Sequence, residues 1–130
     1  MMTDPIADML TRLKNANVVF KPYADVPWSK LKERILNVLK EEQYIKNWEI
    51  IEVSGKKILR VHLLYSGKKP AILKIRKLSK PGCRIYVSAD NIAREKQDSG
   101  IAVLSTSKGV ISSRKAKELN IGGELLFYIW

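Results

Sequence analysis

The sequence predicts an α+β protein built as two small lobes, residues 1–66 and 67–130. Up to residue 45 the apolar residues recur at helical spacing, and from residue 48 they alternate with polar residues, as in strands. Residues 66–70 are polar, charged and turn-prone, which is typical of a boundary between lobes. A chain of 130 residues has room for one such protein and excludes a large multidomain machine.

The first lobe is expected to open with an amphipathic helix over residues 3–16. Thr3 can cap the first amides, the helix dipole favours Asp4, and Pro5 is tolerated in the first turn. Apolar residues then follow at helical spacing: Ile6, Met9, Leu10 and Leu13.

A second helix is expected to begin after the cap residue Ser29 and to end near residues 44–45. Its apolar face consists of Leu31, Ile35, Val38 and Leu39. Between the helices, Pro22 and Pro27 allow only a short extended piece within residues 18–27.

A β-hairpin is expected to close the first lobe. Its strands cover residues 48–53 and 57–65, and Ser54 and Gly55 form the turn. One face of the second strand carries Leu59, Val61, Leu63 and Tyr65.

The second lobe is expected to be mostly β with short helices. Strands over residues 72–78 and 83–88 flank a proline-glycine turn at residues 79–82. Alternation in the second strand places Cys83, Ile85 and Val87 on one face and Arg84, Tyr86 and Ser88 on the outward face. The lobe is completed by a short apolar run at 101–104, a basic helix at 112–119 and a closing strand at 124–130.

The charge of the chain predicts a polyanionic partner. Lys and Arg number 24 against 13 Asp and Glu, which gives a formal net charge of +11. Residues 1–66 contribute 11 basic and 8 acidic groups, and residues 67–130 contribute 13 and 5. The second lobe is therefore expected to carry the main anion-binding surface, although charge alone also fits a membrane surface or an acidic protein.

The sequence offers no residues for a catalytic, cofactor or metal site. His62 is the only histidine, which excludes a two-histidine metal site, and its apolar neighbours favour an ordinary strand-face histidine. Cys83 lies beside Arg84, which would favour a thiolate, but its alternation with apolar residues predicts a small core residue. Phosphate-binding, dinucleotide-binding and zinc-protease motifs are absent. We therefore expect a non-enzymatic protein without a cofactor.

The chain is also expected to reside in the cytoplasm and not in a membrane. No apolar run approaches the roughly 18 residues that cross a bilayer, and the N-terminus lacks the pattern of a signal peptide. One cysteine cannot form an internal disulfide, which agrees with a reducing compartment.

A run of hydroxyls is the most informative local feature. Ser105, Thr106 and Ser107 precede Lys108 and a glycine, and the run is expected to lie between a strand and a helix. Hydroxyls donate and accept hydrogen bonds, so such a loop can read base edges and ribose 2′-hydroxyls while Lys108 approaches phosphate. The alternative is a turn that satisfies its own backbone and caps the next helix.

Two further features fit the same surface. Gly122 and Gly123 would let another backbone approach closely, and Glu124 could accept from an amino group or hold a neighbouring lysine. The alternative is a helix stop followed by a surface glutamate. Tyr86 with Arg84 suggests stacking on a base or a sugar, or else an exposed cross-strand pair.

Four motifs occur in order along the chain: Asp4-Pro5-Ile6-Ala7-Asp8-Met9-Leu10-Thr11-Arg12, Ser79-Lys80-Pro81-Gly82, Ser105-Thr106-Ser107-Lys108-Gly109 and Gly122-Gly123-Glu124. Together they resemble the bacterial small-subunit ribosomal protein family numbered eight, over essentially the whole length. The resemblance implies a two-lobe α+β protein that binds a helix of the central domain of small-subunit ribosomal RNA. Binding would occur early in assembly, without other proteins, and mainly through the second lobe.

The resemblance also implies which residues bind RNA. Ser105, Thr106 and Ser107 would read bases and riboses in an irregular, internally looped region, and Lys108 would meet a phosphate. The same site would include Tyr86, Arg84, Gly122, Gly123 and Glu124. The first lobe would add backbone contacts near Thr3, Lys30 and Lys56.

Further partners follow from the same resemblance. Neighbouring small-subunit ribosomal proteins would touch the chain, and some members repress their own operon by binding its messenger RNA. We expect a monomer when the chain is free.

Charge, the lack of catalytic groups and the hydroxyl run all favour a noncatalytic nucleic-acid binder, and the resemblance selects ribosomal RNA. Two other classes stay open. An unspecific basic module would lose all RNA at moderate salt without preferring any helix. A nuclease or transferase that uses Glu124 with a metal would show magnesium-dependent cleavage that Glu124→Ala abolishes.

Overall fold

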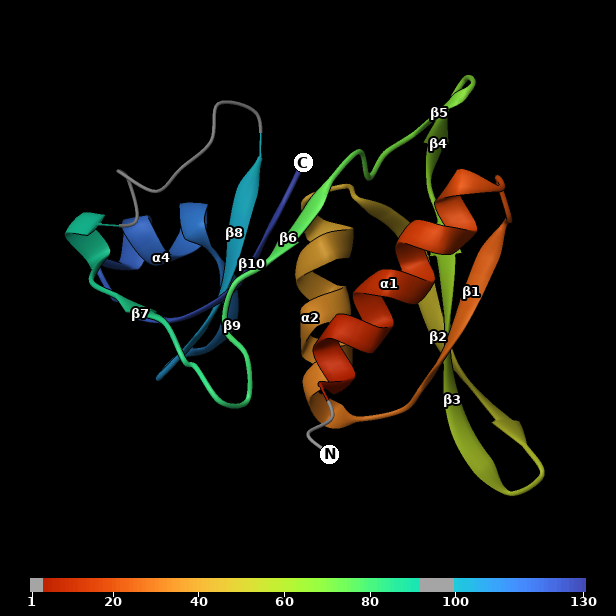
Figure 1. Cartoon of the computed structure of the whole chain (residues 1–130), viewed down its shortest axis with the longest axis horizontal. Coiled ribbons are helices and arrows are strands. Elements are labelled where there is room, and N and C mark those ends of the chain that lie inside the picture. Colours follow the sequence, from red (N-terminus) through yellow and green to blue (C-terminus); the bar gives the residue numbers. More distant parts are fainter. Residues whose placement is uncertain (1–3, 92–99) are drawn as a thin grey trace. The chain divides into compact units, whose positions relative to one another are not determined.

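The computed structural model describes residues 4–91 and 100–130 (Figure 1). The chain divides into two compact units, one of Pro5–Leu73 and one of Lys74–Trp130 together with Asp4. Each unit combines helix with antiparallel sheet, so the predicted α+β class is confirmed. In the part of the chain that is described, no helix has the length and apolar character needed to cross a bilayer.

The first unit contains two helices and a three-stranded antiparallel sheet. Its main elements are α1 (Pro5–Val18), β1 (Tyr23–Pro27), α2 (Lys30–Glu41), β2 (Ile45–Val53) and β3 (Lys56–Leu63). The strand order is β1-β3-β2, and α1 packs against β1 while α2 packs against β2. The first helix thus lies slightly later than residues 3–16, and Thr3, its expected cap, falls outside the described residues.

The second helix follows its predicted cap but not its predicted end. The Ser29 side chain accepts a hydrogen bond from the backbone N–H of Lys32 at 3.2 Å. The helix ends at Glu41 because Gln43 adopts a left-handed φ of 63°. The prediction that Leu31 lies on the buried face is wrong, since its side chain is 40% exposed. The buried positions are Lys32, Ile35, Leu36, Val38 and Leu39.

Cations from both helices cover backbone carbonyls of β1, one of the two edge strands of this sheet. A guanidinium nitrogen of Arg12 donates to the carbonyl oxygen of Asp25 at 3.2 Å. Nζ of Lys32 donates to the carbonyl oxygen of Pro27 at 2.9 Å, and burial lowers the pKa of this ammonium group. Covering an edge in this way disfavours pairing with another chain.

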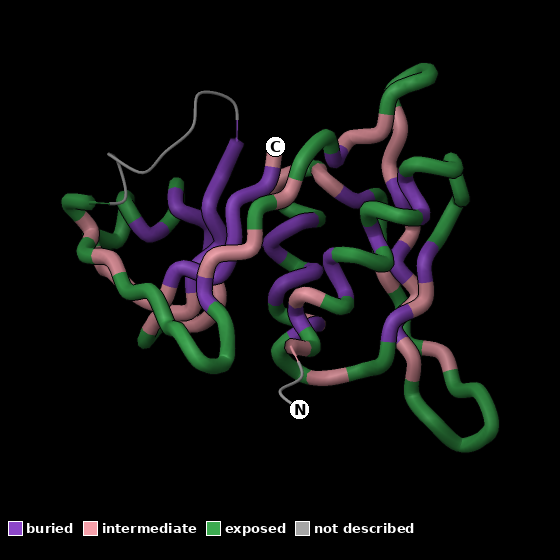
Figure 2. The backbone as a smooth tube through the Cα atoms, in the orientation of Figure 1, coloured by how far each residue is buried: buried purple, intermediate pink, exposed green. Residues whose placement is uncertain are grey.

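The predicted hairpin is present, and its turn has the expected chemistry. Ser54 and Gly55 both have positive φ, 52° and 78°, which suits a tight two-residue turn between twisted strands. Leu59, Val61 and Leu63 are buried on one face of β3, as predicted. Figure 2 colours the buried stretches of the backbone purple. Residues 66–70, the expected boundary, belong to a second small hairpin of β4 (Tyr65–Ser66) and β5 (Lys69–Pro70).

The second unit is organised around one long strand. Its elements are β6 (Ile75–Lys77), β7 (Tyr86–Val87), β8 (Ile101–Thr106), β9 (Gly109–Ser112), α4 (Ser113–Leu119) and β10 (Gly123–Ile129). β10 pairs with β8 along one edge and with β6 and β7 along the other, and β9 extends the sheet beyond β8. The closing strand and the short basic helix were therefore predicted correctly, whereas β9 was missed.

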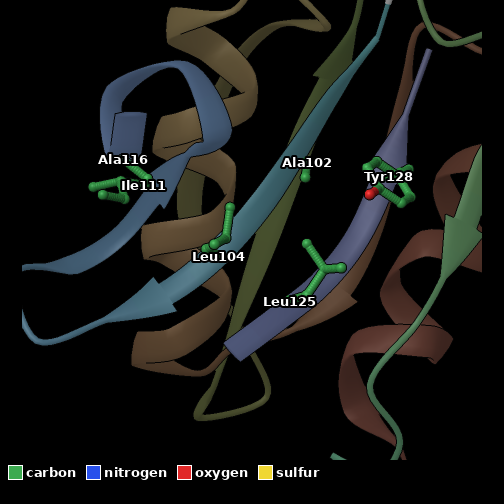
Figure 3. Packing of buried hydrophobic residues seen from close by; sticks show 6 residues of the cluster. All are labelled: Ala102, Leu104, Ile111, Ala116, Leu125 and Tyr128. Carbon is green, nitrogen blue, oxygen red and sulfur yellow. The ribbon is translucent and has the colours of Figure 1, made fainter. Parts of the chain in front are cut away.

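A compact cluster of apolar side chains joins α4 to this sheet (Figure 3). It consists of Ala102, Leu104, Ile111, Ala116, Leu125 and Tyr128. Ser112 caps α4 by accepting from the N–H of Lys115 at 3.2 Å, and Asn120 ends it with a left-handed φ of 55°. The sheet that carries the candidate site thus rests on a closely packed layer.

One core assignment is wrong. Cys83 was expected to be a small core residue, but it is exposed, and Ile85 beside it is 36% exposed. Regular strand pairing is confined to Tyr86–Val87 in this segment, so the alternation upstream has no sheet to bury it. Within the segments 72–78 and 83–88, Ile75–Lys77 and Tyr86–Val87 pair with β10, and an isolated bridge joins Lys80 of the intervening turn to Cys83.

Candidate nucleic-acid interface

Three strands of the second unit bring Tyr86, Glu124 and Ser105 into one row. On β10, Glu124 lies directly opposite Ser105 of β8 on one side and opposite Tyr86 of β7 on the other. Residues that face each other across antiparallel strands project from the same side of the sheet. The row therefore places an aromatic ring, a carboxylate and a hydroxyl next to one another.

The strands that carry this row pack closely because Gly122 and Gly123 have no side chains to keep the neighbouring backbone away. A Cβ atom on Gly123 would lie 2.4 Å from the carbonyl oxygen of Ser105, and one on Gly122 would lie 2.2 Å from that of Val87. Neither distance is possible for a real side chain, so both positions need glycine. The expected close approach of a backbone is confirmed, and the helix ends at Asn120 instead of at a glycine.

Glu124 is held by Arg84. The guanidinium lies 3.1 Å from Oε2 of Glu124, and the side chains are 55% and 13% exposed, respectively. The expected cationic neighbour is thus an arginine and not a lysine. The ion pair orients the carboxylate, while the exposed guanidinium has further N–H groups that can bond a ligand.

The hydroxyl run does not lie between a strand and a helix, as was expected: Ser105 and Thr106 end β8, and Ser107 and Lys108 form the turn between β8 and β9. Oγ1 of Thr106 donates to the carbonyl oxygen of Gly109 at 2.8 Å and accepts from the N–H of Lys108 at 3.1 Å. Among the described residues, the hydroxyls of Ser105 and Ser107 have no hydrogen-bond partner. Thr106 therefore shapes the turn, and the two serines on either side keep their hydroxyls available.

Sequence reasoning missed the anchor of this surface, Ser79. Its side chain is buried, donates to the carbonyl oxygen of Leu125 at 2.6 Å and accepts from the N–H of Ile85 at 3.0 Å. These two bonds fasten the irregular segment before β7 to β10, which positions Arg84 and Tyr86. The signal was present in the motif at residues 79–82, which was interpreted only as a turn.

The resulting surface is open and chemically mixed. The side chain of Tyr86 is 70% exposed, and Ser107 and Lys108 are exposed at the turn. An exposed ring can stack on a base, hydroxyls can bond base edges or 2′-hydroxyls, and cations can meet phosphates. All three kinds of contact are available on one unit.

The RNA contacts that were predicted for the first lobe at Lys30 and Lys56 lie in the unit Pro5–Leu73. Lys30 begins α2 and Lys56 begins β3, and both are exposed. The N–H of Trp28 bonds the carbonyl oxygen of Lys57 at 3.4 Å, so the segment before α2 lies beside the start of β3. Thr3 lies outside the described residues.

The described residues outside this surface offer no metal or catalytic cluster. His62 is a half-buried residue of β3 whose Nε2 pairs with Oε2 of Glu49, so the expectation of an ordinary strand-face histidine holds. Over residues 4–91 and 100–130, no three His, Cys, Asp or Glu side chains gather in a way that could hold a metal ion.

Comparison with known proteins places the whole chain in one family. The sequence profile of the family described as Ribosomal protein S8 matches residues 4–130. The "Small ribosomal subunit protein uS8" of Pseudothermotoga lettingae and that of Thermus thermophilus are each 48% identical to the chain, and each alignment covers all of both proteins. The protein of that name from Dictyoglomus turgidum is 49% identical over 99% of this chain and 98% of its own. The chain therefore belongs to the ribosomal protein S8 family.

Proposed function

We propose that this chain is a non-enzymatic, structural constituent of the small subunit of the bacterial ribosome, in the cytoplasm. Its task is to bind a helix of the central domain of small-subunit ribosomal RNA through the unit Lys74–Trp130. Membership of the ribosomal protein S8 family supports the ribosomal role. The geometry of the second unit supports the choice of RNA-binding face.

The observation that carries the proposal is the row Tyr86–Glu124–Ser105 beside the turn of Ser107 and Lys108. These side chains come from β7, β10 and β8, so the paired sheet fixes their spacing before RNA arrives. A preorganised surface loses less conformational entropy on binding than a mobile loop does.

The target is an irregular RNA helix and not a perfect duplex. The major groove of a regular A-form helix is too deep and narrow for side chains to read. Unpaired bases of an internal loop expose their edges and faces, so the hydroxyls of Ser105 and Ser107 can bond them and Tyr86 can stack. Glu124 accepts from an amino group while Arg84 offsets its charge against the phosphates.

Cations supply the part of the affinity that does not depend on sequence. Lys108 at the turn and Arg84 beside the row would each neutralise a phosphate, and Lys30 and Lys56 would do so from the other unit. Each such contact adds about 0.7–0.9 to the slope of log affinity against log salt.

Assembly order and regulation extend the same proposal. The chain binds its RNA early and without other proteins, stays monomeric when free, and then touches neighbouring small-subunit proteins. A messenger RNA that folds like the ribosomal site would bind the same face and allow repression of its own operon. A net charge of +11 disfavours self-association of the free chain.

A binding titration tests the proposal. The purified chain is titrated against the central-domain helix and against a perfect duplex of equal length, at several salt concentrations. We expect an affinity ratio of about 1,000 or more that persists at moderate salt. A ratio near one from folded protein would reduce the function to unspecific electrostatic binding. Magnesium-dependent cleavage of either RNA would instead favour an enzyme.

A further inference from the structure

We propose that the groove between α1 and β1 in the unit Pro5–Leu73 docks a protein segment that carries aliphatic and acidic side chains. This groove belongs to the unit that does not carry the row Tyr86–Glu124–Ser105. The inference does not depend on the proposed RNA contacts.

The first observation is a run of exposed apolar residues at the end of α1. Val18, Val19 and Phe20 are 69%, 62% and 53% exposed. Single exposed apolar residues are ordinary, but contiguous ones mark interaction surfaces. The run is adjacent in sequence to Lys21, which leads into β1.

The second observation is a groove that this run borders. It has a volume of about 810 Å³ and is lined by residues from the last turns of α1 and the start of β1. Ala16 and Val19 line its helix side, and Pro22, Tyr23 and Ala24 line its strand side. An apolar groove of this size can hold several side chains of a partner.

The third observation is that the surface is held in shape before binding. Phe20 adopts a left-handed φ of 56°, which is uncommon for a bulky residue. Its ring stacks on that of Tyr65 with 5.4 Å between centroids, and the Tyr65 hydroxyl donates to the carbonyl oxygen of Lys21 at 2.6 Å. Strain maintained by such contacts is typical of functional surfaces.

The charge of the groove specifies the partner. Asp25 at its wall is already bound by Arg60 through two hydrogen bonds of 2.9 and 3.1 Å. Arg12 is paired with Asp8 at 3.0 Å, whereas the ammonium group of Lys21 has no acidic partner within the described chain. A carboxylate next to aliphatic side chains would satisfy both Lys21 and the apolar lining.

A protein segment suits this surface better than RNA. Aliphatic valines offer no ring on which a base can stack, and the rings of Phe20 and Tyr65 already use a face on each other. Among the described residues that line the groove, Tyr23 alone carries a ring and a hydroxyl, and the guanidinium of Arg60 lies over that ring at 4.0 Å from its centroid. The lining has no serine hydroxyls like those of Ser105 and Ser107.

Photo-crosslinking inside cells tests this inference. The amino acid p-benzoylphenylalanine replaces Val19 in one strain and Val18 in another. If the bulky probe at position 19 itself blocked docking, the probe at position 18 would still report the contact. A matched probe replaces Val53, which is 48% exposed at the end of β2 in the same unit. After irradiation, adducts are purified and the joined peptide is identified by mass spectrometry.

We expect adducts from residues 18 and 19, but not 53, with one protein whose joined peptide has Asp or Glu beside aliphatic residues. Adding Lys21→Glu should lower their yield by at least about two- to fivefold, the size of a surface ion pair. Lys46→Glu, on the opposite edge strand β2, should leave the yield unchanged.

Adducts with RNA, no adduct, or a yield that Lys21→Glu does not change would overturn the inference. Thermal melting of the variants confirms that they fold. Because irradiation takes place in cells and the RNA titration uses the purified chain, either proposal can fail without the other.

Discussion

Gly123 and Ser105 approach so closely that a Cβ atom on the glycine would lie 2.4 Å from the serine carbonyl oxygen. This contact sets the spacing of β8 and β10 where the candidate site lies. Gly123→Ala should therefore force the two strands apart and cost about 1–3 kcal/mol of unfolding free energy. Specific RNA affinity should fall by about tenfold or more, because the row of side chains is displaced. Urea unfolding and the RNA titration check the two effects.

Gly67→Asn is the matched control for that substitution. Gly67 has a φ of 64°, which asparagine tolerates, and a Cβ atom there would meet nothing within 4 Å. We expect little change in stability and none in RNA specificity. Equal losses from both variants would show that the Gly123 effect is a general glycine effect.

Substitutions at Ser107 and Thr106 should separate an effect on RNA recognition from an effect on folding stability. Ser107→Ala removes an exposed hydroxyl without a partner in the described chain, so stability should stay within about 0.5 kcal/mol. Specific RNA affinity should fall by about 1–3 kcal/mol, because an RNA group loses its bond. Thr106→Val instead breaks the two bonds that shape the turn and should cost about 1 kcal/mol of stability.

The control for the serine substitution is a random RNA of equal length. Ser107→Ala should leave binding to that RNA unchanged, and Lys108→Ala should weaken both complexes and reduce the salt slope by about 0.7–0.9. If Ser107→Ala weakened both RNAs equally, its hydroxyl would have no part in recognition.

How far the sequence predicted this site depends on the range of the interactions. Local signals predicted local structure correctly: Ser29 caps its helix as expected, and Ser54 and Gly55 form the expected turn. Contacts distant in sequence did not follow from local patterns. The bonds from Ser79 to Leu125, and the exposure of Cys83, depend on where β10 runs.

Family resemblance filled part of that gap by naming residues that the fold then brings together. Ser105, Tyr86 and Glu124 are far apart in sequence, yet they face one another across three strands. The sequence could not predict that Thr106, unlike Ser105 and Ser107, uses its hydroxyl to shape the turn. A hydroxyl that bonds its own turn and one that faces solvent have the same sequence signature.

Stability should fall at alkaline pH because of Tyr65. Burial raises the pKa of its phenol above the ordinary value of 10.0. Above pH 10.0 the unfolded chain ionises this group first, so the folded state binds more protons and unfolding free energy falls as pH rises. Tyr65→Phe should remove that part of the decline, and it should cost about 0.5–1.5 kcal/mol at neutral pH through loss of the bond to Lys21.

Urea unfolding at pH 8, 10 and 11 measures the difference between the two proteins. The comparison with Tyr65→Phe is needed because the lowered pKa of Lys32 acts in the opposite direction, raising stability as pH approaches 10.5. Lys32 contributes equally to both proteins and cancels. An unchanged gap between them from pH 8 to pH 11 would contradict the role given to the phenol.

Asn17 should be a residue whose replacement stabilises the fold. It is 3% exposed on α1, and neither its amide nitrogen nor its amide oxygen has a partner in the described chain. An unsatisfied buried amide costs about 1–3 kcal/mol, so the near-isosteric Asn17→Leu should raise the unfolding free energy by about 1–2 kcal/mol. Asn15→Leu provides the control, since Asn15 is exposed on the same helix and makes the same gain in helix propensity. Thermal and urea unfolding of both variants isolate the burial effect as the difference between them, and an equal gain from the two would mean that propensity alone accounts for it.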